Sequence, residues 1–156
     1  MKRITSTLRR CVALSMMLLL CLCIVGCGKK TYENLEAYEK DNPLPASLTN
    51  MTAQAGDTSV QTSLTISGNT LIIKSTMGQK VFGVDPRVDS MMQAQMDQYF
   101  MQDATKKQLD GYIDEIAEAS GIAAYLIDAR YEFYNPNETT PGYTYTYKYS
   151  YSNSSK

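Results

Sequence analysis

The stretch TSVQTSLTISGNTLIIKST, residues 58–76, carries the clearest fold signal in the chain. Apolar and polar residues alternate over positions 60–66, as they do in a strand that buries one of its faces. A second β-rich run begins after the sequence SGNT, residues 67–70, in which glycine tolerates the positive φ of a tight hairpin turn. Residues 58–76 therefore predict a β-hairpin.

Two short helices are predicted before this hairpin. Thr31 suits an N-cap position, and the helical pattern after it ends at Asn42-Pro43, because proline disfavours a helical conformation in the residue before it. Residues 46–55 then carry apolar side chains at helical spacing. We interpret 46–55 as the second short helix.

A long amphipathic pattern follows the hairpin. Asp85 suits the N-cap and Pro86 the first turn of a helix, and apolar residues then recur every three or four positions up to Ser120. The apolar stripe is interrupted at residues 103–105. Residues 87–120 therefore fit either one bent helix or two consecutive helices.

Strand-like alternation returns near the C-terminus. Residues 124–134 predict a half-buried strand with a charged exposed face, Asp128, Arg130 and Glu132. The opposite, buried face would carry Tyr125, Ile127, Ala129, Tyr131 and Phe133. After a loop, every second residue of 143–151 is a tyrosine, which predicts a second hairpin. We therefore expect an α+β fold, with an antiparallel four-stranded sheet of two hairpins. A long amphipathic helix would cover one face of this sheet, and short N-terminal helices would precede it.

The first 27 residues have the three-part layout of a secretory signal. Basic residues at positions 2, 3, 9 and 10 precede an apolar run over residues 11–26 that is interrupted only by Ser15. Sixteen residues span about 24 Å of helix, which is short of a bilayer core of about 30 Å and disfavours a stable membrane span. Arg9-Arg10 also fits a twin-arginine signal, although the usual downstream context is missing. An uncleaved signal anchor is a second alternative, and a buried core helix is the third and least favoured, because no polar residues line any face of the run.

The sequence IVGC, residues 24–27, resembles the lipobox of bacterial lipoproteins. The resemblance implies that diacylglycerol is attached to the Cys27 thiol and that the signal is cleaved between Gly26 and Cys27. We expect no other cofactor, and we expect the protein to be held on the extracytoplasmic face of the cell membrane. The predicted divisions are a signal peptide (1–26), a lipidated cysteine with a short tether (27–30), a single domain (31–152) and a frayed tail (153–156).

The composition of the mature chain excludes several functional classes. Three of the four cysteines lie before Cys27 and the chain has no histidine, which excludes disulfides, cysteine metal sites, histidine-ligated zinc and histidine-based triads. Four of the fifteen basic residues also lie in the signal, which leaves 11 basic against 16 acidic side chains, a formal net charge of −5. Such a charge disfavours nucleic-acid binding. We therefore predict neither an enzyme nor a metal site.

The tyrosine-rich end is the main candidate for a binding surface. Its rings on one strand face would present an aromatic platform to sugars or peptides. The alternative is that this face packs against the methionine-rich helix, as part of the core. The candidate residues are Tyr143, Tyr145, Tyr147, Tyr149 and Tyr151.

Acidic residues offer two weaker candidates. Asp110, Asp114 and Glu118 recur every four residues, but a straight helical row cannot converge on a calcium ion, so we expect a solvated face. Asp128 and Glu132 stand four residues apart on a strand, about 13 Å, which is too far for the carboxylate pair of a glycosidase.

A family resemblance rests on four segments: YENLEAY (32–38), ISGNTL (66–71), the helical pattern of 109–121 and RYEFYN (130–135). Together they resemble the small Gram-positive lipoproteins of the domain-of-unknown-function 4854 family. The resemblance implies an extracytoplasmic lipoprotein domain with no assigned activity. The tyrosine-rich end after Pro141 departs from the shorter ending expected of that family.

The leading hypothesis is a non-enzymatic, lipid-anchored domain that binds a ligand or partner at the cell surface. One alternative is a structural or assembly accessory of a membrane complex, and another is a binder of cell-wall glycans through the tyrosine face. In each case the partners are the membrane, through the lipid, and a protein or cell-wall component, not nucleic acid.

Overall fold

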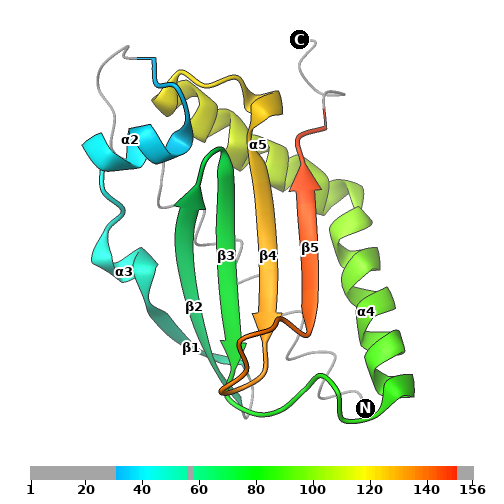
Figure 1. Ribbon diagram of the computed structural model, residues 1–156. Helices are drawn as coiled ribbons and strands as arrows, with labels where there is room; N and C mark the ends of the chain where they lie inside the picture. The colour runs from blue at the N-terminus through cyan, green and yellow to red at the C-terminus, as the bar shows by residue number, and fades with distance from the viewer. Residues whose placement is uncertain (1–30, 56–57, 151–156) are drawn as a thin grey trace.

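The computed structural model describes residues 31–55 and 58–150, which form one sheet with helices packed against it (Figure 1). The predicted signal peptide, the lipobox with Cys27, Tyr151 and the predicted tail lie outside the described residues. In the described part of the chain, no helix combines the length and the apolar character that crossing a membrane requires.

The sheet has five strands, and neighbours in the sheet are also neighbours along the chain. All adjacent pairs are antiparallel except β3 and β4, which are parallel. The predicted α+β class is confirmed, but the prediction of a purely antiparallel, four-stranded sheet is wrong. The strands are β1 (Met51–Ala55), β2 (Thr58–Ser67), β3 (Thr70–Met77), β4 (Asp128–Tyr134) and β5 (Tyr143–Lys148).

The parallel pair follows from the helical connection between β3 and β4. The helices α4 (Pro86–Met101) and α5 (Asp103–Ser120) carry the chain back along the sheet, so β4 enters from the same end as β3 (Figure 1). A crossover of this kind aligns its two strands in parallel, whereas a hairpin turn reverses the direction. Thr70 pairs with Asp128 and Thr76 with Tyr134, so the pairing extends over almost the whole of both strands.

The additional strand, β1, lies where the second short helix was predicted. The helix α3 (Ala46–Thr49) is a single turn, and the chain then extends so that Met51 lies opposite Thr62 of β2. Over so few residues, helical spacing of apolar side chains does not exclude a strand. Main-chain pairing with β2 prevails over that local pattern.

The helix α2 (Leu35–Asp41) begins later than predicted, because Asn34 caps it in place of Thr31. The Asn34 side chain accepts a hydrogen bond from Ala37 N at 2.8 Å, and Asn69 Oδ1 in the β2–β3 turn accepts one from Leu35 N at 3.0 Å. The predicted hairpin is confirmed, and Gly68 has the positive φ, 57°, that its turn requires. The start of α2 is thereby fixed to the end of this hairpin.

The long amphipathic pattern forms two helices. They are separated at Gln102, whose ψ of 136° is extended. Asp85 caps α4 as predicted, since its side chain accepts a hydrogen bond from Arg87 N at 2.8 Å. Gly121 ends α5 in the left-handed conformation, with φ of 70°.

The strand predicted from position 124 begins at Asp128 instead. A 3₁₀ turn, η2 (Ala124–Leu126), precedes it, and Tyr125, which was expected to face the core, is exposed in this turn. Ile122 and Ile127 on either side of the turn are buried. The two isoleucines hold η2 at the surface of the fold.

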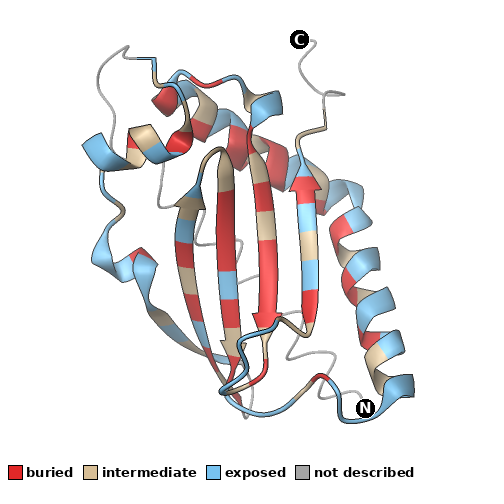
Figure 2. Cartoon of the chain, in the orientation of Figure 1, coloured by how far each residue is buried: buried red, intermediate tan, exposed pale blue. Residues whose placement is uncertain are grey.

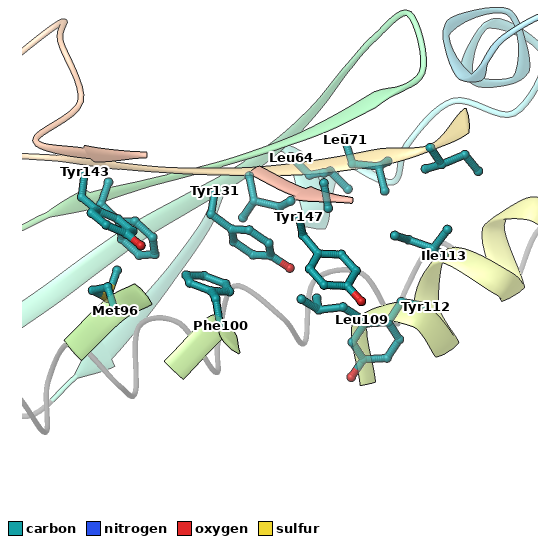
Figure 3. Packing of buried hydrophobic residues seen from close by; sticks show 14 of the residues in the cluster. Leu64, Leu71, Met96, Phe100, Leu109, Tyr112, Ile113, Tyr131, Tyr143 and Tyr147 are labelled. Atoms are coloured by element: carbon teal, nitrogen blue, oxygen red, sulfur yellow. The ribbon is translucent and has the colours of Figure 1, made fainter. Parts of the chain in front are cut away.

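The core lies between one face of the sheet and the helices (Figure 3). Inward and outward side chains alternate along each strand, so buried and exposed bands alternate on the sheet in Figure 2. Figure 1 shows the helices α4 and α5 on one side of the sheet only. Fully buried members of the core include Leu64, Leu71, Phe100, Ile113 and Tyr131.

Candidate functional site

The predicted tyrosine surface lies mostly inside the fold. Tyr143 and Tyr147 are buried, and Figure 3 shows both side chains directed from the sheet toward the helices. Tyr145 is half-buried, and its ring stacks on Phe100 with a centroid distance of 4.2 Å. These three rings pack in or against the core, as the alternative interpretation of this segment expected.

Carboxylates on the two long helices accept hydrogen bonds from tyrosine hydroxyls of the C-terminal segment. The pairs are Tyr143 with Asp97 (2.6 Å), Tyr147 with Asp110 (2.6 Å) and Tyr149 with Asp114 (2.7 Å). The pKa of Tyr143 and of Tyr147 is raised well above the ordinary value. Burial is the largest cause, and the hydrogen bond to the carboxylate is the second. Both hydroxyls therefore stay protonated and serve as donors within the fold.

Asp110 does not belong to a solvated face, and that prediction is wrong for this residue. Its side chain is 3% exposed, Oδ1 accepts a hydrogen bond from Ser150 N at 3.0 Å, and Oδ2 accepts one from Ser150 Oγ at 2.5 Å. Asp114 and Glu118 are exposed as predicted. Spacing along the helix did not show which carboxylate turns toward the C-terminal segment.

The outward side of β2 to β5 forms a polar surface, which we call the open sheet face. Cross-strand pairing places Ser63, Lys74, Glu132 and Thr144 in one row across the four strands. No described helix covers this side in Figure 1. The members of the open sheet face are Gln61, Ser63, Thr65, Ile72, Lys74, Thr76, Arg130, Glu132, Tyr134, Thr144, Thr146 and Lys148.

A polar network of one ion pair and one hydrogen bond lies on the open sheet face. Arg130 Nε is 2.9 Å from Glu132 Oε1, and Tyr134 Oη donates a hydrogen bond to Glu132 Oε2 at 2.6 Å. The three residues alternate along β4, so they point to the same side of the sheet. Glu132 is only 8% exposed, whereas the Arg130 side chain remains accessible.

The network is suited to recognition rather than to proton transfer. Burial, the hydrogen bond to Glu132 and the Glu132 charge raise the pKa of Tyr134 to about 12, against an opposing effect of Arg130. A general acid or base works best with a pKa near the operating pH. Both carboxylate oxygens of Glu132 are already engaged by Arg130 and Tyr134.

A small pocket of about 230 Å³ lies beside the loop that joins β4 to β5. The buried side chain of Asn135 stabilises its wall, because Oδ1 accepts hydrogen bonds from Val81 N at 2.8 Å and Phe82 N at 2.9 Å. Its Nδ2 donates to Phe82 O and to Glu138 Oε2. The volume is below the roughly 300–1,000 Å³ of most small-molecule sites, and Asn135 is fully used in holding two loops together.

Among the described residues, no group of three or more Asp, Glu, Cys or His side chains could hold a metal ion. Asp128 and Glu132 both lie on β4, four positions apart, and we assign them no joint role.

The sequence indicated a charged outward face on β4 but not the network that forms there. The available signal was the spacing Arg-x-Glu-x-Tyr over residues 130–134, which places one cation, one carboxylate and one phenol on the same side of a strand. Asn135 carried no such signal, because its partners lie more than fifty residues earlier in the chain.

No protein-family model, curated protein or solved structure matches the chain. The resemblance to the domain-of-unknown-function 4854 family therefore remains a prediction from the sequence.

Proposed function

We propose that the protein is a non-catalytic, lipid-anchored domain on the outer face of the cell membrane that binds a protein partner through its open sheet face. The lipobox at residues 24–27 and the thiol of Cys27 support the anchor. The observation that carries the binding role is the network of Arg130, Glu132 and Tyr134, held in place on a side of the sheet that no described helix covers.

The shape of the open sheet face favours a macromolecule over a small molecule. Small-molecule sites are concave, whereas these donors and acceptors are spread across four paired strands. Arginine and tyrosine are enriched at the energetic centres of protein interfaces. Arg130 and Tyr134 offer such a pair, and Lys74 lies opposite Glu132 on the neighbouring strand.

A glycan partner has less support. Sugar binding would use exposed aromatic rings, and Tyr143 and Tyr147 are buried against the helices. Tyr134 is the aromatic member of the open sheet face, and its hydroxyl is already bonded to Glu132. A structural or assembly accessory would also need a surface that binds a protein partner. That alternative is therefore included in the proposed protein binding.

The anchor is tested by fatty-acid labelling in cells. A Cys27→Ala variant should lose the label and leave the membrane fraction, because no other cysteine remains in the mature chain. A Cys23→Ala variant, altered within the predicted signal, is the matched control. It should keep the fatty-acid label and stay in the membrane fraction. Label that persists in Cys27→Ala would overturn the anchor.

The partner surface is tested by site-specific photo-crosslinking in cells. A photoreactive residue at Thr65 or Thr144, both exposed on the open sheet face, should give the same discrete protein adduct. The matched control position is Glu115, which is exposed on α5. The adduct should weaken when Arg130→Ala is added. An adduct from Glu115 alone would place the partner on the helices and overturn the assignment.

A further inference from the structure

We infer that the turn η2, with Tyr125 and Leu126 at its surface, rests against the outer leaflet of the bilayer. The inference rests on the lipid anchor of the proposed function. It adds an orientation of the domain and a second, lipid-contacting surface.

Two large apolar side chains are exposed next to each other in η2. Tyr125 is 63% exposed and Leu126 is 50% exposed, and residues 121–127 include no charged side chain. Isolated apolar residues at a surface are ordinary, so the exposure of Tyr125 and Leu126 alone does not indicate a binding surface. The inference depends on where this pair lies in the fold.

Hydrogen bonds and buried neighbours fix the conformation of the turn η2. Leu126 N donates to Ala123 O at 2.9 Å, and Ile127 N donates to Ala124 O at 3.0 Å. Ile122 and Ile127 are buried at its two ends. The fold thus holds the exposed pair outward.

The described chain begins beside this turn. Tyr32 N donates a hydrogen bond to Ser120 O at 3.2 Å, so the start of the domain is attached to the last residue of α5. The loop that carries η2 follows Ser120 directly. Figure 1 shows the first described residues, in blue, and this loop, in gold, at the same end of the sheet.

The tether between the lipid and the domain is short. Three residues separate Cys27 from Thr31, and four Cα–Cα steps reach at most about 14 Å. Acyl chains on Cys27 would lie in the bilayer, so the end of the domain that carries Thr31 would stay close to the headgroups. The opposite end of the sheet is about 25 Å away, the length of an eight-residue strand such as β3.

The chemistry of the pair suits the membrane surface. Tyrosine is enriched at the boundary between lipid and water, where its ring meets apolar groups and its hydroxyl meets water, and leucine adds apolar area. Glu118 and Asp128 flank the loop in the sequence, so attraction to anionic headgroups does not explain a contact there. The contact would depend on apolar burial and would change little with salt.

The chain has no tryptophan, which allows a single fluorescent reporter. A Tyr125→Trp variant is purified from membranes with its lipid and reconstituted into vesicles of phosphatidylcholine and phosphatidylglycerol that contain brominated lipid. Its emission should shift to shorter wavelength and be strongly quenched, and adding Leu126→Asp should reduce the quenching. Val84→Trp is the matched control, because Val84 is 65% exposed and lies between the end of β3 and the start of α4. The other end of β3, at Thr70, pairs with Asp128 beside η2, so a reporter at position 84 should stay unquenched.

Mass spectrometry before reconstitution separates the two ways to fail. A chain without lipid on Cys27 would overturn the anchor, and the inference with it. A lipidated chain in which the reporters at positions 125 and 84 are quenched equally, or not at all, would overturn the membrane contact and leave the anchor standing. Quenching at position 125 that Leu126→Asp does not change would also overturn it.

Discussion

Tyr147 Oη donates a hydrogen bond to Asp110 Oδ1 at 2.6 Å, and this contact joins the last strand of the sheet to the middle of α5. The same carboxylate accepts two hydrogen bonds from Ser150, just beyond β5. A buried carboxylate is stable only when its oxygens are satisfied in this way. Asp110 therefore fixes the C-terminal end of the described chain to the helical layer.

Tyr147→Phe should lower the free energy of unfolding by about 1.5–3 kcal/mol, because it removes a buried hydrogen bond to a charged acceptor. Urea denaturation monitored by circular dichroism measures the change. Tyr125→Phe is the matched control and should stay within about 0.5 kcal/mol, since the Tyr125 side chain is exposed. Equal stability of the two variants would contradict the role assigned to the Asp110 contact.

Tyr131→Phe should not lower the free energy of unfolding, in contrast to Tyr147→Phe. The Tyr131 hydroxyl is buried and has no hydrogen-bond partner among the described residues, although its ring packs against Phe100 at 4.9 Å. Removal of an unsatisfied buried hydroxyl should leave stability unchanged or raise it by about 1 kcal/mol. The same urea titration applies, and a loss as large as that of Tyr147→Phe would show that the hydroxyl has a partner in solution.

Stability should fall above about pH 10. Burial raises the pKa of Tyr131, Tyr143, Tyr145 and Tyr147 above the ordinary value, so the folded state retains protons that the unfolded state releases. This contribution is fully present below the unfolded pKa of 10.0 and is lost as the pH rises through the folded values. Chemical denaturation at pH 8, 10 and 11 should give a free energy of unfolding that is highest at pH 8 and clearly lowest at pH 11, and a constant value would contradict the burial of these hydroxyls.

Glu132→Gln should lower the pKa of Tyr134 from about 12 part of the way toward 10.0. The substitution removes the negative charge beside the phenol but keeps an oxygen acceptor, while the effect of burial remains. NMR titration of the tyrosine ring signals measures the shift. Asp97→Asn, which alters the partner of Tyr143, should leave the Tyr134 titration unchanged.

Two glycine substitutions should act in opposite directions. Gly111→Ala in α5 should stabilise the protein by up to about 1 kcal/mol, because the site has open space and alanine favours the helix. Gly142→Ala should destabilise it by about 1–3 kcal/mol, because the added Cβ would overlap the ring of buried Phe82. Thermal unfolding of both variants checks the pair, and a stabilising Gly142→Ala would contradict the described loop packing.

Local signals in the sequence were sufficient for several elements. The SGNT turn determined the β2–β3 hairpin, and Asp85 followed by Pro86 determined the start of α4, because a tight turn and a cap depend on neighbouring residues. The break between α4 and α5 was also visible as an interruption of the apolar stripe. These features need no knowledge of distant contacts.

Strand pairing and burial that depend on residues distant in the chain could not be predicted in the same way. The parallel pairing of β3 with β4 depends on how α4 and α5 pack across the sheet, and β1 exists because it pairs with β2. The sequence also predicted a charged outward side for β4, but the burial of Glu132 depends on its partners Arg130 and Tyr134. Tertiary packing decided each of these outcomes.

The parallel pair at the middle of the sheet also sets the order in which the chain can fold. The β2–β3 hairpin leaves the ribosome first, but its neighbour β4 follows only after about fifty more residues. Until then Leu71 and Ile73 lack the cover they have in the finished sheet, and such non-local pairings form slowly. In a nascent chain of this protein, the apolar side of the β2–β3 hairpin would therefore stay incompletely covered until synthesis has passed β4.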